Sequence, residues 1–122
     1  MSVQLLTLFK KNIISFIDEL VDSYPSESDF VLIRVILKDQ VPAQEIMDHF
    51  LNQVLPLKDQ IANRDEKIFS DSDVFYLGLD KINCKGLKGL WESGKVDEDN
   101  KKVIWQWLDS FVTIVERYKK SL

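Results

Sequence analysis

The alternation of apolar and polar residues is most regular between Asp97 and Lys120, where its period predicts one long amphipathic helix. Acidic residues at its start and basic residues at its end match the helix macrodipole. The apolar positions cover an arc of roughly 200° on a helical wheel, which is wider than the stripe of a typical surface helix. We therefore expect this helix either to be buried on two flanks or to keep part of its apolar face for a partner. The apolar positions are Val103, Ile104, Trp105, Trp107, Leu108, Phe111, Val112, Ile114, Val115 and Tyr118.

Two tryptophans of this helix raise the same question of burial within the chain or contact with a partner. Trp105 and Trp107 are two positions apart, so their side chains point about 200° away from each other around the helix. Either other helices wrap the last helix and cover both, or one of them lies in an interface, where tryptophan is enriched. The candidate interface residues are Trp105, Trp107, Val103 and Ile114.

The N-terminal part of the chain predicts two further helices. The first runs from Ser2 to about Tyr24 and is ended by Pro25, with Leu8 alone among its apolar residues on the polar side. The second contains the apolar run of residues 30–37 and ends near Lys38 or Asp39, with Ser26 and Asp29 resembling a capping box. The β-branched residues of this run would also suit a buried strand, but no second strand is available to pair with it.

The middle of the chain is less regular. A third helix is predicted to begin at Pro42 and to kink or break at Pro56, and its pattern fades after Asn63. The segment from Asn63 to Asp80 is interpreted as a surface loop whose aromatic residues pack into the core, and long loops often carry function. A short fourth helix is predicted for residues 80–91, ended by Ser93 and Gly94.

Together these elements predict an all-α fold, an irregular bundle of four to five helices with a long C-terminal helix at its centre and the first helix packed along it. The length of 122 residues suits a single domain over residues 1–122. Only four Gly and three Pro favour long helices over many short elements.

Charge and cysteine content restrict the class of partner and the compartment. The net charge of −4 argues against nonspecific binding to nucleic acid, which depends on clustered Lys and Arg. The single Cys84 cannot form an internal disulfide, so we expect a reducing compartment. No apolar run approaches the roughly 18 residues that a membrane span requires. We expect a soluble intracellular protein without a membrane partner.

Candidate chemistry is sparse. His49 and Cys84 are the only soft metal ligands, too few for a zinc site within one chain. The sequence Asp71-Ser72-Asp73 does not continue as a calcium loop, and residues 85–89 lack the spacing of a phosphate-binding loop. Paired carboxylates are interpreted as solvated helix faces and caps. We therefore expect no catalytic residue, no cofactor and no metal, and a protein that is not an enzyme; an enzyme using carboxylates of residues 63–80 is the least favoured alternative.

Several short segments resemble short uncharacterised proteins of nucleocytoplasmic large DNA viruses. The resemblance covers roughly the C-terminal two thirds of the chain, and Ile68, Asp99 and Trp107 stand where that class has Phe, Glu and Tyr. It implies no activity and no catalytic residues, and it would place the protein in the cytoplasm or nucleus of an infected host cell or in the virion. The segments are residues 56–61, 63–69, 87–91 and 100–108.

The resulting functional hypothesis is a non-enzymatic viral protein that serves as a structural or protein-interaction module through a helix face. Its partner would be another protein or a second copy of itself, as a homo-oligomer. The alternative is a regulator that binds a host protein, and a small nucleic-acid-associated protein is less favoured.

Overall fold

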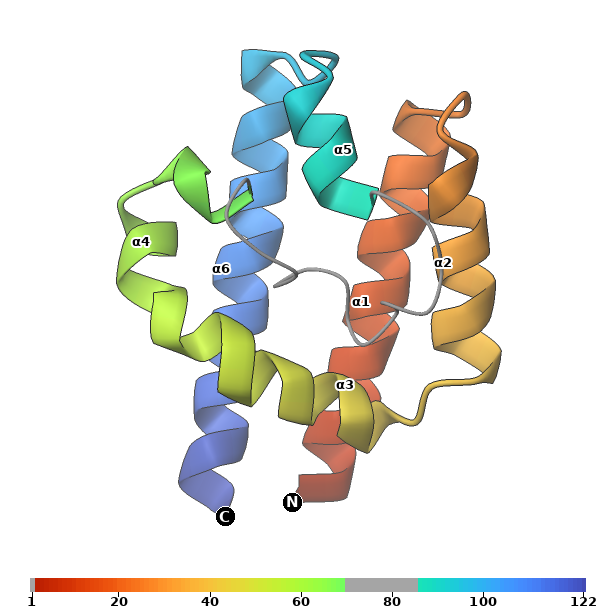
Figure 1. Cartoon of the computed structure of the whole chain (residues 1–122). Helices are drawn as coiled ribbons and strands as arrows, with labels where there is room; N and C mark the ends of the chain where they lie inside the picture. The colour runs from red at the N-terminus through yellow and green to blue at the C-terminus, as the bar shows by residue number, and fades with distance from the viewer. Residues whose placement is uncertain (1, 70–85) are drawn as a thin grey trace.

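The computed structural model describes residues 2–69 and 86–122, and within these ranges it is built from helices without strands (Figure 1). A π-helical turn, η1 (Phe50–Val54), and a 3-10 turn, η2 (Leu55–Leu57), join α3 to α4, and a second 3-10 turn, η3 (Glu66–Phe69), follows α4. If the continuous stretch from α3 to α4 is taken as one helix, the predicted all-α bundle of four to five helices is confirmed. The α-helices are α1 (Ser2–Ser23), α2 (Ser28–Asp39), α3 (Ala43–His49), α4 (Lys58–Ala62), α5 (Gly86–Glu92) and α6 (Glu98–Ser121).

Helix α6 lies between two groups of elements. Helix α1 packs antiparallel along one flank, and α4 with η1 and η2 covers another (Figure 1). Helix α2 packs on α1 at the edge of the bundle, and α3 crosses α1 in front of the other helices. The predicted packing of the first helix along the last helix is therefore confirmed, and α1, which also packs on α2 and α3, shares the centre of the bundle with α6.

The centre of the core is a cluster of four phenylalanines from α1, η1 and α6. The ring of Phe111 lies 5.9 Å from Phe9, 5.5 Å from Phe16 and 5.8 Å from Phe50, in edge-to-face geometry. Phe9 and Phe50 are closer still, at 4.9 Å. Such aromatic pairs contribute about 0.5–1.5 kcal/mol each beyond the burial of their area. This cluster joins the three elements into one core.

Both ends of α6 follow from its sequence. The Asp97 carboxylate accepts a hydrogen bond from the Asn100 backbone N–H at 2.8 Å and caps the helix. Lys119 and Lys120 occupy the last turn, where the macrodipole favours cations. Gly94, in the connection from α5, adopts φ +75°, which a residue without Cβ accepts at little cost. The helix predicted from Asp97 to Lys120 is confirmed to within a residue at each end.

Pro56 interrupts the helical stretch as predicted, but the π-helical turn before it was not expected. Because Pro56 has no N–H, it cannot donate to the carbonyl of Asn52 four residues earlier. The Leu55 N–H instead donates to the carbonyl of Phe50, five residues back, which is the π-helical pattern. The chain then tightens into η2 before α4 begins.

Helix α2 contradicts the predicted capping box and confirms the prediction of a helix for residues 30–37. The capping box of Ser26 and Asp29 is not formed, because the N-cap position belongs to Glu27 and no side chain caps the helix. The Glu27 carboxylate instead accepts a hydrogen bond from Lys95 Nζ at 2.6 Å. The apolar run of residues 30–37 is a helix, so the choice of helix over strand is confirmed.

The predicted loop and fourth helix are described only in part. Phe69 is buried, as expected of an aromatic residue that packs into the core. Residues 70–85, with the aromatic cluster at 75–76, the first half of the predicted helix and Cys84, lie outside the described residues. Helix α5 confirms the end of the predicted helix. No helix in the described ranges combines the length and hydropathy needed to cross a membrane.

Candidate interaction surface on helix α2

Helix α2 buries one face. Phe30, Ile33 and Leu37 recur at helical spacing and are almost fully covered, mainly by α1 and on a smaller area by α5. Arg34, on the flank of this face, forms an ion pair with Asp18 of α1. The inner face and this ion pair together fix the orientation of α2 on the bundle.

The opposite face of α2 is also apolar, and about half of the surface of its residues is exposed. Val31, Leu32 and Val35 are 50%, 44% and 45% exposed. Their spacing of one and four positions places them side by side on the outer surface of the helix, at the edge of the bundle in Figure 1. We call these three residues the α2 outer face. A surface helix normally carries polar residues there, and adjoining exposed apolar side chains mark interaction sites.

Charged residues flank the α2 outer face at its two ends. Glu27 and Asp29 lie at the start of the helix, and Lys38 and Asp39 lie at its end. Glu27 is bonded to Lys95, whereas Lys38 and Asp39 form no ion pair with a described residue. The surface is thus an apolar centre between an acidic start and an end that carries one charge of each sign.

The four residues predicted as a candidate interface on α6 differ in how much of their surface is exposed. Trp105 and Ile114 are only 5% and 7% exposed, so both lie in the core of the chain and offer almost no surface to a partner. Val103 is 38% exposed. Trp107 is half-buried against Phe16. An interface on this helix would therefore rest on Val103 and the exposed edge of Trp107, and it stays a prediction.

Both tryptophans are held by contacts within the chain. The Trp107 ring lies 5.6 Å from Phe16, and its Nε1–H donates to the Glu19 carboxylate of α1. Trp105 lies on the other flank, 5.1 Å from Phe69 and 5.7 Å from Trp91. The wide apolar arc of α6 is thus buried on two flanks, the first of the two alternatives that the sequence left open.

The flank around Trp105 forms a polar and aromatic clasp, which we define as Glu66, Phe69, Trp91, Lys101 and Trp105. Phe69 stacks on Trp91 at 4.0 Å. Glu66 accepts hydrogen bonds from Trp91 Nε1 at 2.8 Å and forms an ion pair with Lys101 at 3.2 Å. The hydrogen bonds from Lys101 and Trp91 lower the pKa of the Glu66 carboxyl below its ordinary value. The clasp therefore joins η3, α5 and α6.

Arg64 reinforces the clasp from the turn before η3. It adopts φ 56°, uncommon outside glycine, and it donates two hydrogen bonds to Asp109, at 2.9 and 2.8 Å. Its guanidinium also lies 5.5 Å from the centre of the Trp105 ring. The bonds to Asp109 raise the pKa of Arg64 above its ordinary value. These polar groups are paired with one another, which is the arrangement of a structural contact.

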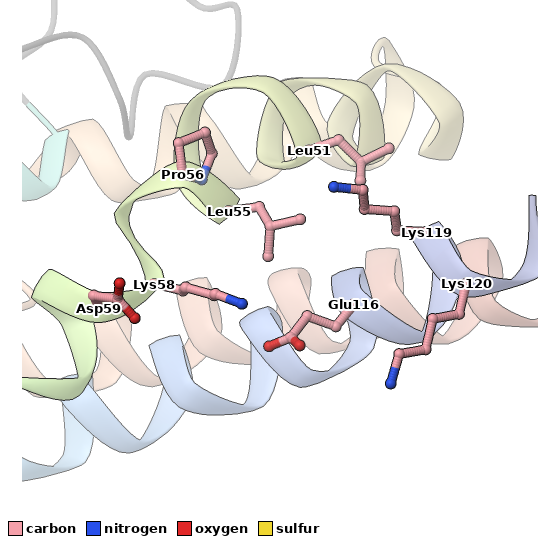
Figure 2. Close-up of a pocket in the computed structure, with 8 residues that line it drawn as sticks. All are labelled: Leu51, Leu55, Pro56, Lys58, Asp59, Glu116, Lys119 and Lys120. Carbon is pink, nitrogen blue, oxygen red and sulfur yellow. The ribbon is translucent and has the colours of Figure 1, made fainter.

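Figure 2 shows a groove of about 600 Å³ between the η1–α4 stretch and the end of α6. Leu51 and Leu55 form its apolar wall, and Lys58 points across it toward Glu116. Lys119 and Lys120 line the opposite side, where the helix dipole alone favours them. The lining includes no histidine, cysteine or hydroxyl side chain. Because its charged side chains carry both signs, the groove selects no ligand class.

Metal-binding side chains do not gather in the described ranges, where no three of His, Cys, Asp and Glu come together in a suitable group. His49 is the last residue of α3, and its ring lies 6.1 Å from that of Phe50. Cys84 lies outside the described residues.

The α2 outer face was missed in the sequence, although its signal was present. Residues 30–37 contain seven apolar residues, interrupted only by Arg34. Once such a run is assigned to a helix, its apolar side chains must cover more than one face, because neighbouring positions lie about 100° apart. The excess of apolar residues over one buried stripe predicts an exposed apolar face.

No protein-family profile, curated protein or solved structure matches this chain. The viral resemblance therefore stays a prediction, and the functional argument depends on the described residues alone.

Proposed function

We propose that this protein is a non-enzymatic interaction module that binds a protein partner through the α2 outer face. The observation that carries the proposal is the adjacent exposure of Val31, Leu32 and Val35, each close to half exposed on one side of a helix. By its resemblance to short viral proteins, the module would act in an infected host cell or in the virion.

The energetics favour a partner for this surface. Burial of apolar area is worth roughly 25 cal/mol per Å², so covering the exposed half of each side chain would yield about 1 kcal/mol. Within the chain these exposed halves contribute nothing to the core. A partner that covers all three would gain a few kcal/mol from the apolar centre alone, and the flanking charges would orient it.

Photo-crosslinking tests the proposal with a matched control inside the same chain. Leu8 is 42% exposed on α1, close to the 44% of Leu32, but it has no adjoining pair of exposed apolar residues. A photoreactive residue at position 32 should form a defined adduct in cells that express the protein, and the same residue at position 8 should not. The adduct is identified by mass spectrometry and reproduced with the purified components.

A second substitution in the photo-crosslinking experiment distinguishes specific binding at the α2 outer face from chance proximity. With the photoreactive group at position 32, Val35→Asp should abolish the adduct, whereas Val3→Asp should leave it, because Val3 is an exposed valine of α1 outside the surface. Equal adducts from positions 8 and 32 would overturn the proposal, as would an adduct that survives Val35→Asp. An adduct with a host protein would favour a regulator, and an adduct with a second copy would favour an assembly unit.

A further inference from the structure

We infer that the partner of the α2 outer face is a second copy of this chain, with the two α2 helices packed antiparallel across a two-fold axis. This inference rests on the proposed function, because it names the occupant of the same surface. Most soluble homo-oligomers are two-fold dimers in which one patch meets its own copy. The α2 outer face is suited to such pairing because Lys38 near its end and Glu27 at its start carry opposite charges.

The charges at the two ends of α2 select the antiparallel orientation. The centre of the α2 outer face lies near position 33, so antiparallel pairing brings the last turn of one helix opposite the start of the other. Lys38 and Glu27 are eleven positions apart, close to three full turns, and therefore lie on the same side of the helix. Lys38 of each copy then faces Glu27 of the other, twice by symmetry.

Parallel pairing would lose this complementarity. It would place Lys38 against Lys38 and Glu27 against Glu27, and it would align the two helix dipoles. In the antiparallel arrangement Asp39 also approaches the start of the opposite helix, where the helix dipole favours an anion and the carboxylates of Glu27 and Asp29 oppose it.

The apolar centre also pairs well with itself. Antiparallel packing brings Val31 of one copy against Val35 of the other on both sides of the axis, with the two Leu32 side chains near the centre. Arg34 is held on the flank by its ion pair with Asp18 of α1, which keeps its charge off the surface. Three side chains from each copy are fewer than the 20–30 residues that each partner of a standard interface contributes, so the dimer is weak and reversible.

Analytical ultracentrifugation of the full chain over a wide concentration range tests self-association. We expect a monomer–dimer equilibrium that Leu32→Asp abolishes and Leu8→Asp leaves unchanged. Circular dichroism checks that both variants keep their helix content. A chain that stays monomeric at millimolar concentration would overturn the inference, and so would a dimer that Leu32→Asp does not affect.

Charge reversal tests the orientation. Lys38→Glu and Glu27→Lys should each weaken the dimer by about two- to tenfold, since each changes two symmetric surface pairs. The double variant should recover most of the loss. Lys95→Ala, which removes only the partner of Glu27 within the chain, should not weaken the dimer. Additive losses in the double variant would exclude the antiparallel arrangement.

Disulfide formation in a Cys84→Ser background gives a geometric test of the antiparallel orientation. A mixture of Val31→Cys and Val35→Cys chains should oxidise mainly to the mixed disulfide dimer, because position 31 of one copy faces position 35 of the other. Predominant disulfides between identical chains would indicate parallel pairing and overturn the inference. A monomeric chain that still gives a specific photo-adduct with another protein would overturn only the inference, whereas a monomeric chain without any adduct would overturn both proposals.

Discussion

Helices α2 and α6 both carry more apolar residues than one buried stripe needs, but only α6 has its excess covered. Helix α6 is packed by α1 on one flank and by α4, η1 and η2 on another, and the clasp adds a further contact near its start. Helix α2 packs on α1 and more lightly on α5. The difference shows that the number of neighbouring elements, rather than the apolar width of a helix, decides which apolar face is exposed.

The same comparison explains why the two helices have different roles. The apolar residues of α6 are largely consumed in holding the bundle together, so changes there should act on stability. The α2 outer face lies outside the core, so changes there should act on association and leave the fold intact. The following predictions separate these two expectations, in order of expected size.

The largest effect is expected at the centre of α6. Phe111→Ala removes a ring that contacts Phe9, Phe16 and Phe50 and leaves a cavity among them. We expect a loss of about 3–5 kcal/mol in the free energy of unfolding, a large share of the 5–15 kcal/mol typical of a domain. Urea denaturation followed by circular dichroism measures it. A loss below about 1 kcal/mol would contradict the central position of this cluster.

The two faces of α2 provide the sharpest matched pair. Leu37 is fully buried and Leu32 is 44% exposed on the same helix, so the same exchange can be made on each face. We expect Leu37→Ala to cost about 2–4 kcal/mol, by lost burial and a residual cavity. Leu32→Ala should change the unfolding free energy by no more than about 0.5 kcal/mol, measured at concentrations below those of any association. Similar losses at both positions would mean that the outer face is covered within the chain.

Helix α6 has a side-chain cap at its start, whereas α2 has none. Removing this cap should have a smaller effect on stability. Asp97→Ala removes the side chain that accepts the Asn100 N–H and should cost about 1 kcal/mol. The control is Asp99→Ala, in the first turn of α6 but not at the cap, where we expect at most about 0.5 kcal/mol. The difference in urea midpoint between the two variants measures the cap. Equal losses of stability in the two variants would show that Asp97 acts only through its negative charge and not through the capping hydrogen bond.

The smallest effect is a pH dependence in the clasp that fixes one flank of α6. The pKa of Glu66 is lowered in the folded protein, so its contribution to stability is present above the pKa of the unfolded chain. It is lost as the pH falls through the lower folded pKa, because protonation removes the attraction to Lys101. Since the Glu66 side chain is 53% exposed, solvent screening limits the contribution to a few tenths of a kcal/mol, or about 0.5 at most.

Tryptophan fluorescence and unfolding measurements between about pH 6 and pH 3 follow this titration, because this range extends to both sides of the ordinary pKa of a glutamate carboxyl. Glu66→Gln should lower stability slightly at neutral pH and reduce the pH dependence in this range. The other carboxylates contribute their own slope, so the comparison is the difference between the two proteins. A difference that is independent of pH would show that the Trp91 hydrogen bond, and not the charge, carries the contribution.

Much of this protein can be predicted from the sequence because its strongest signals are local. Helical periodicity, Pro25 and Pro56, the cap at Asp97 and the turn at Gly94 act within a few residues, and they predict the all-α fold and the bounds of α1 and α6. The capping box predicted at Ser26 is not formed, because the N-cap position belongs to Glu27, whose carboxylate is paired with Lys95, distant in sequence.

The exposure of each apolar face was decided by the tertiary structure. Residues 30–37 and the last helix both carry an excess of apolar side chains, and the period of each pattern says which residues share a face. It does not say how many neighbours will cover that face, since this depends on contacts between elements far apart in the chain. Packing by α1 on one flank and by α4 and the clasp on another buries Trp105 and most of Trp107, whereas the edge position of α2 leaves Val31, Leu32 and Val35 exposed.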